Sequence, residues 1–197
     1  MAHEYGSRAA LKQRLGIEAD DTTADALLDS ALGASSRGID NATGRRFWLD
    51  ETAVPRVYRL AGRVVCEADG DLLLVDDIGN VDDLVVELGG GSSWTVITGY
   101  ETQPDNALAD GAPITALLRS GGWGTYNTRV RVTTRWGFPT EPNDITEASL
   151  IQASRLYKRK DSPEGIIGSA EWGVRNLSRR DPDMWALIEP YILPGFG

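Results

Sequence analysis

The stretch Arg131–Asp161, RVTTRWGFPTEPNDITEASLIQASRLYKRKD, passes from one type of secondary structure to another within a few residues. With the preceding Val130, its first residues alternate between apolar and polar side chains. Val130 and Val132 would face one side, which is typical of a strand with one buried face. We expect Gly137 to supply a bend after this strand and Pro139 to end it, because proline cannot donate to a ladder of backbone hydrogen bonds. The stretch therefore predicts a strand joined directly to the next element of the chain.

The second half of the stretch has the pattern of a helix. Asn143 or Asp144 is a candidate N-cap, and Glu147 would complete an Asp-x-x-Glu capping box. Apolar residues recur at helical spacing toward the end of the stretch. Cations are favoured near a helix C-terminus by the helix dipole. Four basic residues stand there: Arg155, Lys158, Arg159 and Lys160.

Working outward, the sequence predicts further helices on both sides. A helix over 7–15 begins at Ser7 and stops at Gly16, and a second helix extends from Thr22 to about 43. A last helix begins at Asp181, followed by proline at the first helical position. Between the second and third of the longer helices, residues 45–140 consist of short β-type runs separated by turns.

This order predicts an α+β fold. Helices that are separated in sequence would pack together as one small bundle of about four helices, with the β-rich segment as an insertion between the second and third long helices. We expect residues 1–44 and 141–197 to form the helical bundle, and residues 45–140 to form the inserted β-rich domain.

Composition and charge limit the possible functions. The 197 residues carry a net charge of −9 with ordinary hydrophobic content, and no apolar run is long enough to cross a membrane. No secretory signal is expected, and the single Cys66 excludes an internal disulfide. Acidic residues concentrate between positions 62 and 88 and basic ones between 151 and 180. Such a chain is not a general DNA binder; its two charged regions suit either an oriented assembly or two solvated faces.

The sequence contains no recognisable catalytic motif. His3 is the one histidine, and no phosphate-binding loop, nucleophile elbow or zinc motif occurs. The glycine-rich run at 89–93 is interpreted as a hairpin loop. Carboxylates between 71 and 83 lack the spacing of an EF-hand loop and are interpreted as solvated strand ends. We therefore expect no enzyme activity, no catalytic residues, no cofactor and no metal.

The chain has six tryptophans, which is many for its length. Trp48 and Trp136 are predicted to lie in the core. Trp172 and Trp185 stand beside the basic C-terminal segment and are candidate anchors of a protein–protein contact. A sugar-binding cleft is the alternative interpretation of a tryptophan-rich β segment.

An ordered set of segments resembles the head-tail adaptor (head-tail connector) proteins of long-tailed, non-contractile bacteriophages. The likeness extends over nearly the whole chain, although no single motif in it is unique. The segments are LKQRLGI, ADALLDSALGASSRGIDNATGRRF, YRL, LLVDDI, QPDNA, VRVTTRWGFPTEPNDITEASLIQASRLYKRKDSPEG and DPDMWALIEPYI.

The resemblance implies a structural virion protein. Adaptors of this family form a ring, commonly of twelve subunits, below the portal, where they extend the DNA channel and join the capsid to the tail. The implied partners are the portal protein, neighbouring copies of the same chain, and the next connector or tail protein. Genome DNA would pass without sequence-specific binding, and no membrane is involved. The protein would be made in the host bacterial cytoplasm and would reside at the head-tail junction of the virion.

The family uses its C-terminal segment to dock on the portal. The residues expected to make the portal contact here are Arg175, Arg179, Arg180, Trp185, Tyr191 and Ile192. Small residues on the second helix and bases on the third are expected at the subunit interface, the bases pairing with an acidic region of a neighbour or with the portal. These residues are Ala34, Ser35, Gly38, Arg155, Lys158 and Arg159.

Two alternatives remain open. A head-completion stopper or tail-terminator protein would have a different neighbour in the same particle. A carbohydrate-binding module or small hydrolase would use the tryptophan-rich β segment and would be a monomer.

Overall fold

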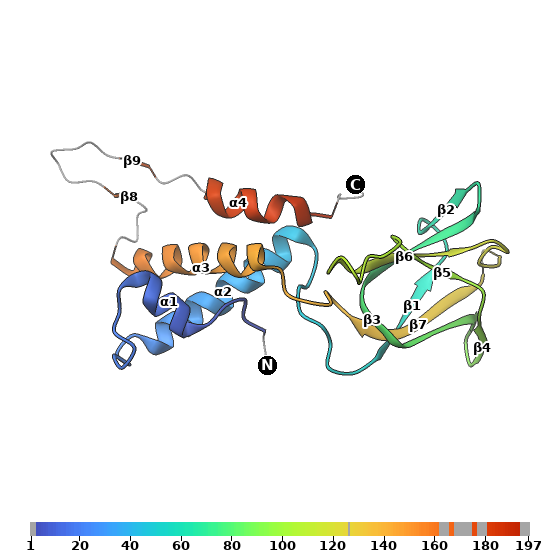
Figure 1. The fold of residues 1–197 in the computed structure, drawn as a ribbon, viewed down its shortest axis with the longest axis horizontal. Helices are drawn as coiled ribbons and strands as arrows, with labels where there is room; N and C mark the ends of the chain where they lie inside the picture. The colour runs from blue at the N-terminus through green and yellow to red at the C-terminus, as the bar shows by residue number, and fades with distance from the viewer. Residues whose placement is uncertain (1–2, 126, 162–165, 168–174, 177–180, 194–197) are drawn as a thin grey trace. The chain divides into compact units, whose positions relative to one another are not determined.

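A computed structural model describes residues 3–125, 127–161, 166–167, 175–176 and 181–193 of the chain (Figure 1). The chain divides into two compact units. Residues 1–45 and 141–197 belong to one unit, and residues 46–140 belong to the other. The first unit is helical and the second is a sheet.

The helical unit contains four α-helices within the described residues. They are α1 (Arg8–Leu15), α2 (Asp25–Thr43), α3 (Asn143–Lys158) and α4 (Pro182–Ile188). Short 3-10 helices follow α3 (η1, Arg159–Asp161) and α4 (η2, Glu189–Tyr191). The segment between α3 and α4 includes the paired two-residue strands β8 (Ile166–Ile167) and β9 (Arg175–Asn176).

Local capping explains where two of these helices begin. The Ser7 hydroxyl accepts a hydrogen bond from the Ala10 backbone N–H at 3.2 Å, and the chain leaves α1 through Gly16 in the left-handed region. Asp181 caps α4 as predicted, accepting from the N–H groups of Asp183 and Met184. The predicted side-chain cap of α3 is wrong, because this helix follows Pro142 and has no capping side-chain hydrogen bond. α2 also begins without one, after Ala24.

α2 and α3 run side by side and bury a common apolar seam (Figure 1). Small residues allow the two backbones to approach closely: the buried Ser35 hydroxyl donates to the Ser149 carbonyl at 2.9 Å. The core of this unit is made by aliphatic side chains from three helices. They include Leu11, Leu28, Ala31, Leu32, Leu150 and Ala153.

The second unit is a seven-stranded antiparallel sheet. Its strands are β1 (Val54–Arg59), β2 (Val64–Glu67), β3 (Gly70–Gly90), β4 (Ser93–Ile97), β5 (Glu101–Gln103), β6 (Ile114–Arg119) and β7 (Arg129–Trp136). The strand order is β1-β7-β3-β6-β5, and β2 and β4 also pair with β3.

The 21-residue strand β3 organises this sheet. Its first part pairs with β2 and β6, and its last part pairs with β7 and β4. The register shifts between Leu74 and Ile78 and again between Ile78 and Val85, so the strand bends at these irregularities. The glycine-rich run is the hairpin we predicted, with β3 ending at Gly90 and β4 beginning at Ser93.

The two parts of the sheet share one core. β7 alternates as predicted, with Val130, Val132, Thr134 and Trp136 buried. Residues from β1, β3 and β6 complete the cluster with Trp123, which the sequence did not single out. After β7 the chain bends at Gly137 (φ 113°), whose N–H donates to the Asp77 carbonyl at 2.8 Å.

The predicted fold class is wrong. The described chain is dominated by a seven-stranded antiparallel sheet with four helices of 8, 19, 16 and 7 residues, and it is not a helical bundle with a β insertion. From the sequence, the segment that forms β3 was interpreted as separate short runs, because its acidic residues and Gly79 resemble turn signals. They instead lie in one bent strand that pairs with four others, which makes the sheet a principal structural element.

Candidate interaction surfaces

The described residues offer little for catalysis or metal binding. Among them, no group of three or more histidine, cysteine, aspartate or glutamate side chains could hold a metal ion. Among the same residues, no helix has both the length and the hydropathy needed to span a membrane. The features that remain are polar networks and exposed faces, and these are the candidates for a functional role.

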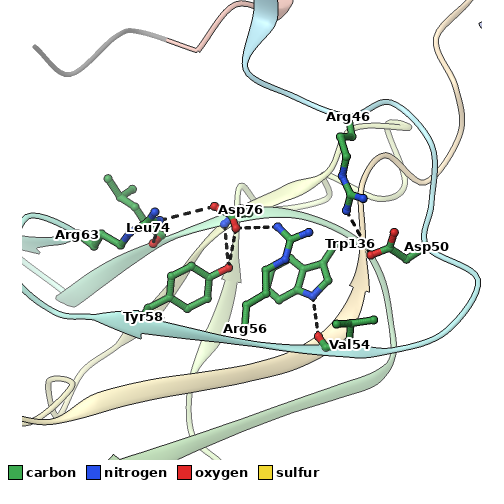
Figure 2. Close-up of polar contacts among 9 residues, drawn as sticks. All are labelled: Arg46, Asp50, Val54, Arg56, Tyr58, Arg63, Leu74, Asp76 and Trp136. Carbon is green, nitrogen blue, oxygen red and sulfur yellow. Dashed lines mark hydrogen bonds and ion pairs between the residues drawn. The ribbon is translucent and has the colours of Figure 1, made fainter. Parts of the chain in front are cut away.

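A polar network of several side chains surrounds Asp76 on β3 (Figure 2). Its carboxylate accepts hydrogen bonds from Arg56 Nη1 at 2.7 Å and from the Tyr58 hydroxyl at 3.1 Å, and Arg63 Nη1 lies 3.7 Å away. The Arg56 guanidinium lies over the Trp136 ring, 4.4 Å from its centroid. Burial, reinforced by the Asp76 charge, raises the pKa of Tyr58 well above its ordinary value.

This network joins β1 to β3 and has no reactive group. The Asp76 charge is already balanced by two guanidinium groups, and the tyrosine hydroxyl is held protonated. A general base or nucleophile needs a free lone pair directed at a substrate. We therefore assign the Asp76 network to stability.

The predicted portal-binding residues lie in several environments. Arg179 and Arg180 are outside the described residues, and Arg175 is described only as part of the backbone of β9. Trp185 on α4, Tyr191 on η2 and Ile192 are half-buried. The last three residues therefore lie in one C-terminal segment, and their part in a portal contact stays a prediction.

Polar contacts among the described residues hold this C-terminal segment against the rest of its unit. Asp181 forms an ion pair with Arg155 at 3.1 Å. The Tyr191 hydroxyl donates to Asp144 at 3.3 Å, and burial together with this contact raises the pKa of Tyr191. The Leu193 N–H donates to the Thr43 carbonyl at 3.0 Å, while the Leu193 side chain is 47% exposed.

The predicted subunit-interface residues separate into two groups. Ala34, Gly38, Lys158 and Arg159 are exposed and available to a neighbour. The other two are engaged within their own chain: Ser35 is fully buried against α3, and Arg155 is mostly buried beside Asp181. A small residue on a helix can lie either against another helix of the same chain or on the exposed side. The sequence pattern therefore did not show that Ser35 is buried and Ala34 is exposed.

A further surface, on the outward side of the sheet, was not predicted. Arg131 on β7 makes two hydrogen bonds to Glu87 on β3, both of 2.5 Å, and its guanidinium lies 4.5 Å from the centroid of the Trp94 ring. The Arg131 contact holds the pKa of Glu87 below its usual value. Val57 and Val96 occupy the same row of this face and are 49% and 61% exposed. The alternation of β7 placed Arg131 on the outward side, but nothing in the sequence identified its cross-strand partners.

Comparison with known proteins gives a likeness at the level of fold. The chain matches no protein-family model, and no curated protein matches its sequence. Among solved structures, it is similar to a chain in the neck of an empty gene transfer agent (GTA) particle computed with C6 symmetry. The likeness has a TM-score of 0.55 at 18% sequence identity and covers 100% of this chain and 98% of that chain, so the two share their fold from end to end.

Proposed function

We propose that this protein is a structural component of the neck of a phage-like particle and, more specifically, a head-tail adaptor. In this role it forms a ring below the portal, extends the DNA channel and joins the capsid to the tail. The observation that carries the proposal is the fold likeness to a neck chain along the full length of both proteins. An isolated shared domain would support it far less.

The charge of the chain agrees with this role. A net charge of −9 disfavours tight binding to DNA phosphates, so a genome would slide past the ring instead of adhering to it. A ring of identical subunits needs two different surfaces on each copy that meet head to tail. A copy number of twelve, the family's common value, is compatible with the sixfold symmetry of the neck that contains the similar chain.

The portal contact is assigned to the C-terminal segment. Trp185, Tyr191 and Ile192 would provide the apolar part of the contact, and Arg175, Arg179 and Arg180 would provide its charge. The exposed bases Lys158 and Arg159 would pair with an acidic region of a neighbouring subunit or with the portal. Aromatic and arginine side chains are the usual anchors of protein–protein interfaces. Ala34 and Gly38 on the exposed side of α2 would lie against a neighbouring subunit.

The test is the native mass of the purified protein, alone and mixed with its cognate portal, measured by light scattering. An adaptor either forms a ring with a mass near twelve times 21.4 kDa or joins the portal complex as bound subunits. Binding to the tail tube but not to the portal would replace the adaptor assignment with a stopper or tail-terminator role. A monomer that binds neither partner would refute a neck function.

A further inference from the structure

Two outward faces of the sheet unit carry opposite unbalanced charges. The first, which we name the arginine face, is the outward side of β1, β7, β3 and β4. Its central row contains Val57, Arg131, Glu87 and Val96, in which the arginine and glutamate neutralise each other. The next row contains Arg59 and Arg129, which are direct cross-strand partners.

Arg59 and Arg129 are not neutralised in the part of the chain that the structure describes. No hydrogen bond or ion pair of either guanidinium occurs there, and the cross-strand neighbour of Arg129 on β3 is Gly89, which has no side chain. Like charges directly opposite each other destabilise a sheet. The pair is therefore unfavourable in an isolated chain and would be relieved by carboxylates supplied from outside.

The second face, which we name the acidic groove, lies on β5, β6 and the turn before β3. It is a groove with a volume of about 610 Å³. Its lining includes three carboxylates, those of Asp69, Glu101 and Asp105, and no basic residue. Within the described residues, the carboxylates of Asp69 and Glu101 have no hydrogen bond or ion pair, and the Asp105 carboxylate accepts only from Gln103 Nε2 at 3.2 Å.

The groove also has an apolar side. Leu118 lines it and is the cross-strand partner of Glu101, so both lie on the side of β6 opposite the buried Leu117. The same row continues through Leu72 to Val65, which is 46% exposed. The groove therefore matches the arginine face in character, since each combines exposed aliphatic side chains with charges of one sign.

The two faces lie on different strands of the sheet, the arginine face on β1, β7, β3 and β4 and the acidic groove on β5, β6 and the turn before β3. β6 and β7 both contribute to the single core of the unit, through Leu117 and through Val130 and Val132. The outward side of each region lies opposite its core-facing residues. Each copy of the chain thus presents an arginine face on one part of its sheet and an acidic groove on another.

We propose that the arginine face of one copy packs on the acidic groove of the next, so that Arg59 and Arg129 pair with Asp69, Glu101 and Asp105 across the interface. The contact joins two different surfaces of identical chains and can therefore repeat head to tail until a ring closes. This inference rests on the ring of the proposed function and identifies one of its interfaces.

The experiment uses two charge-reversed full-length chains. The groove variant carries Asp69→Lys and Glu101→Lys, and the arginine-face variant carries Arg59→Glu and Arg129→Glu. The arginine-face variant still has two like charges opposite each other at positions 59 and 129. The repulsion between these two strands is therefore similar to that in the natural chain. A control, Glu51→Lys with Asp83→Lys, changes two exposed acids outside the groove by the same total charge as the groove variant.

Self-association is measured by sedimentation velocity at low ionic strength, with circular dichroism confirming that each variant is folded. Each variant alone should self-associate about tenfold or more weakly than the natural chain, because like charges meet across the contact. An equimolar mixture of the two should regain assembly, since each basic surface then meets an acidic one in an alternating ring. The control should assemble like the natural chain.

Where the free natural chain stays monomeric, the same comparison is made on the number of copies bound per portal ring. Natural-strength assembly of both variants alone, or failure of their mixture to recover, would overturn this interface while leaving the adaptor ring intact. If the control self-associates as weakly as the groove variant, the effect arises from net charge, and the proposed interface is again overturned. A natural chain that neither self-associates nor loads on the portal would refute the interface and the proposed function together.

Discussion

At the scale of single residues, Gly137 is the glycine at which an added Cβ would meet the closest contact. Its φ of 113° is strained for any other residue, and a Cβ there would lie 1.8 Å from the Trp48 carbonyl oxygen. Gly137→Ala should therefore lower the free energy of unfolding by about 3 kcal/mol or more. Gly62→Ala is the control: φ is 74° but nothing lies within 4 Å of the added Cβ, so about 1–2 kcal/mol is expected. Urea denaturation would measure both, and equal losses would contradict the steric explanation.

The raised pKa of Tyr58 predicts how the stability of the fold responds to alkaline pH. Its pKa is raised in the folded chain, first by burial and then by the Asp76 carboxylate, whereas an unfolded tyrosine ionises near pH 10. The unfolded state therefore binds fewer protons above about pH 10, and the stability that Tyr58 contributes is lost as pH rises from there toward its folded pKa.

Tyr58→Phe should show a shallower loss of stability above pH 10 than the natural chain. At neutral pH the substitution should cost about 1 kcal/mol, because the hydrogen bond to Asp76 is lost. Urea midpoints compared at pH 8 and pH 11 would measure both effects. Tyr100 and Tyr191, whose pKa values are also raised, contribute equally to the two proteins. Parallel pH dependences would show that Tyr58 does not govern the alkaline response.

At the scale of elements, substitution by leucine should destabilise the chain at one position of α2 and leave its stability almost unchanged at the adjacent position. Ser35→Leu forces a larger side chain into the α2–α3 seam and removes the hydrogen bond to Ser149, so a loss of about 1–3 kcal/mol is expected. Ala34→Leu adds the same bulk on the exposed side and should change stability by less than about 0.5 kcal/mol. Thermal unfolding followed by circular dichroism would measure the two.

Ala34→Leu also tests the proposed subunit interface. A neighbour packed on the exposed small residues of α2 would meet a larger side chain, and assembly should weaken although the chain remains folded. Native mass measured at several protein concentrations would detect this change. If Ala34→Leu assembles like the natural chain, the exposed side of α2 is not part of the subunit interface. This conclusion does not depend on the result for Ser35→Leu.

At the scale of the whole molecule, portal binding should depend on the basic C-terminal region. Replacing Arg179 and Arg180 together by alanine removes two candidate anchors of the portal contact, so co-sedimentation with portal rings should fall. The double substitution should leave ring formation by the free chain unaffected. Unchanged portal binding would refute the assignment of these two residues to the portal contact.

Features that depend on a few neighbouring residues could be predicted from the sequence. The caps at Ser7 and Asp181, the stop at Gly16 and the alternation of β7 all arise from side chains within about one turn or one pleat of each other. The same local signals misled the prediction at β3, where bulges resembled turns and one bent strand was interpreted as several.

Only the tertiary structure decided which residues meet across the sheet and which side of a helix is buried. The pairing of Arg131 with Glu87, the unbalanced pair of Arg59 and Arg129, and the acidic groove all depend on register between strands far apart in the chain. A shift of one residue would move every side chain of a strand to the opposite face, and no local pattern specifies that choice. The sequence by itself therefore determined most of the elements and several of their ends, whereas packing determined the sheet and the surfaces through which the chain could assemble.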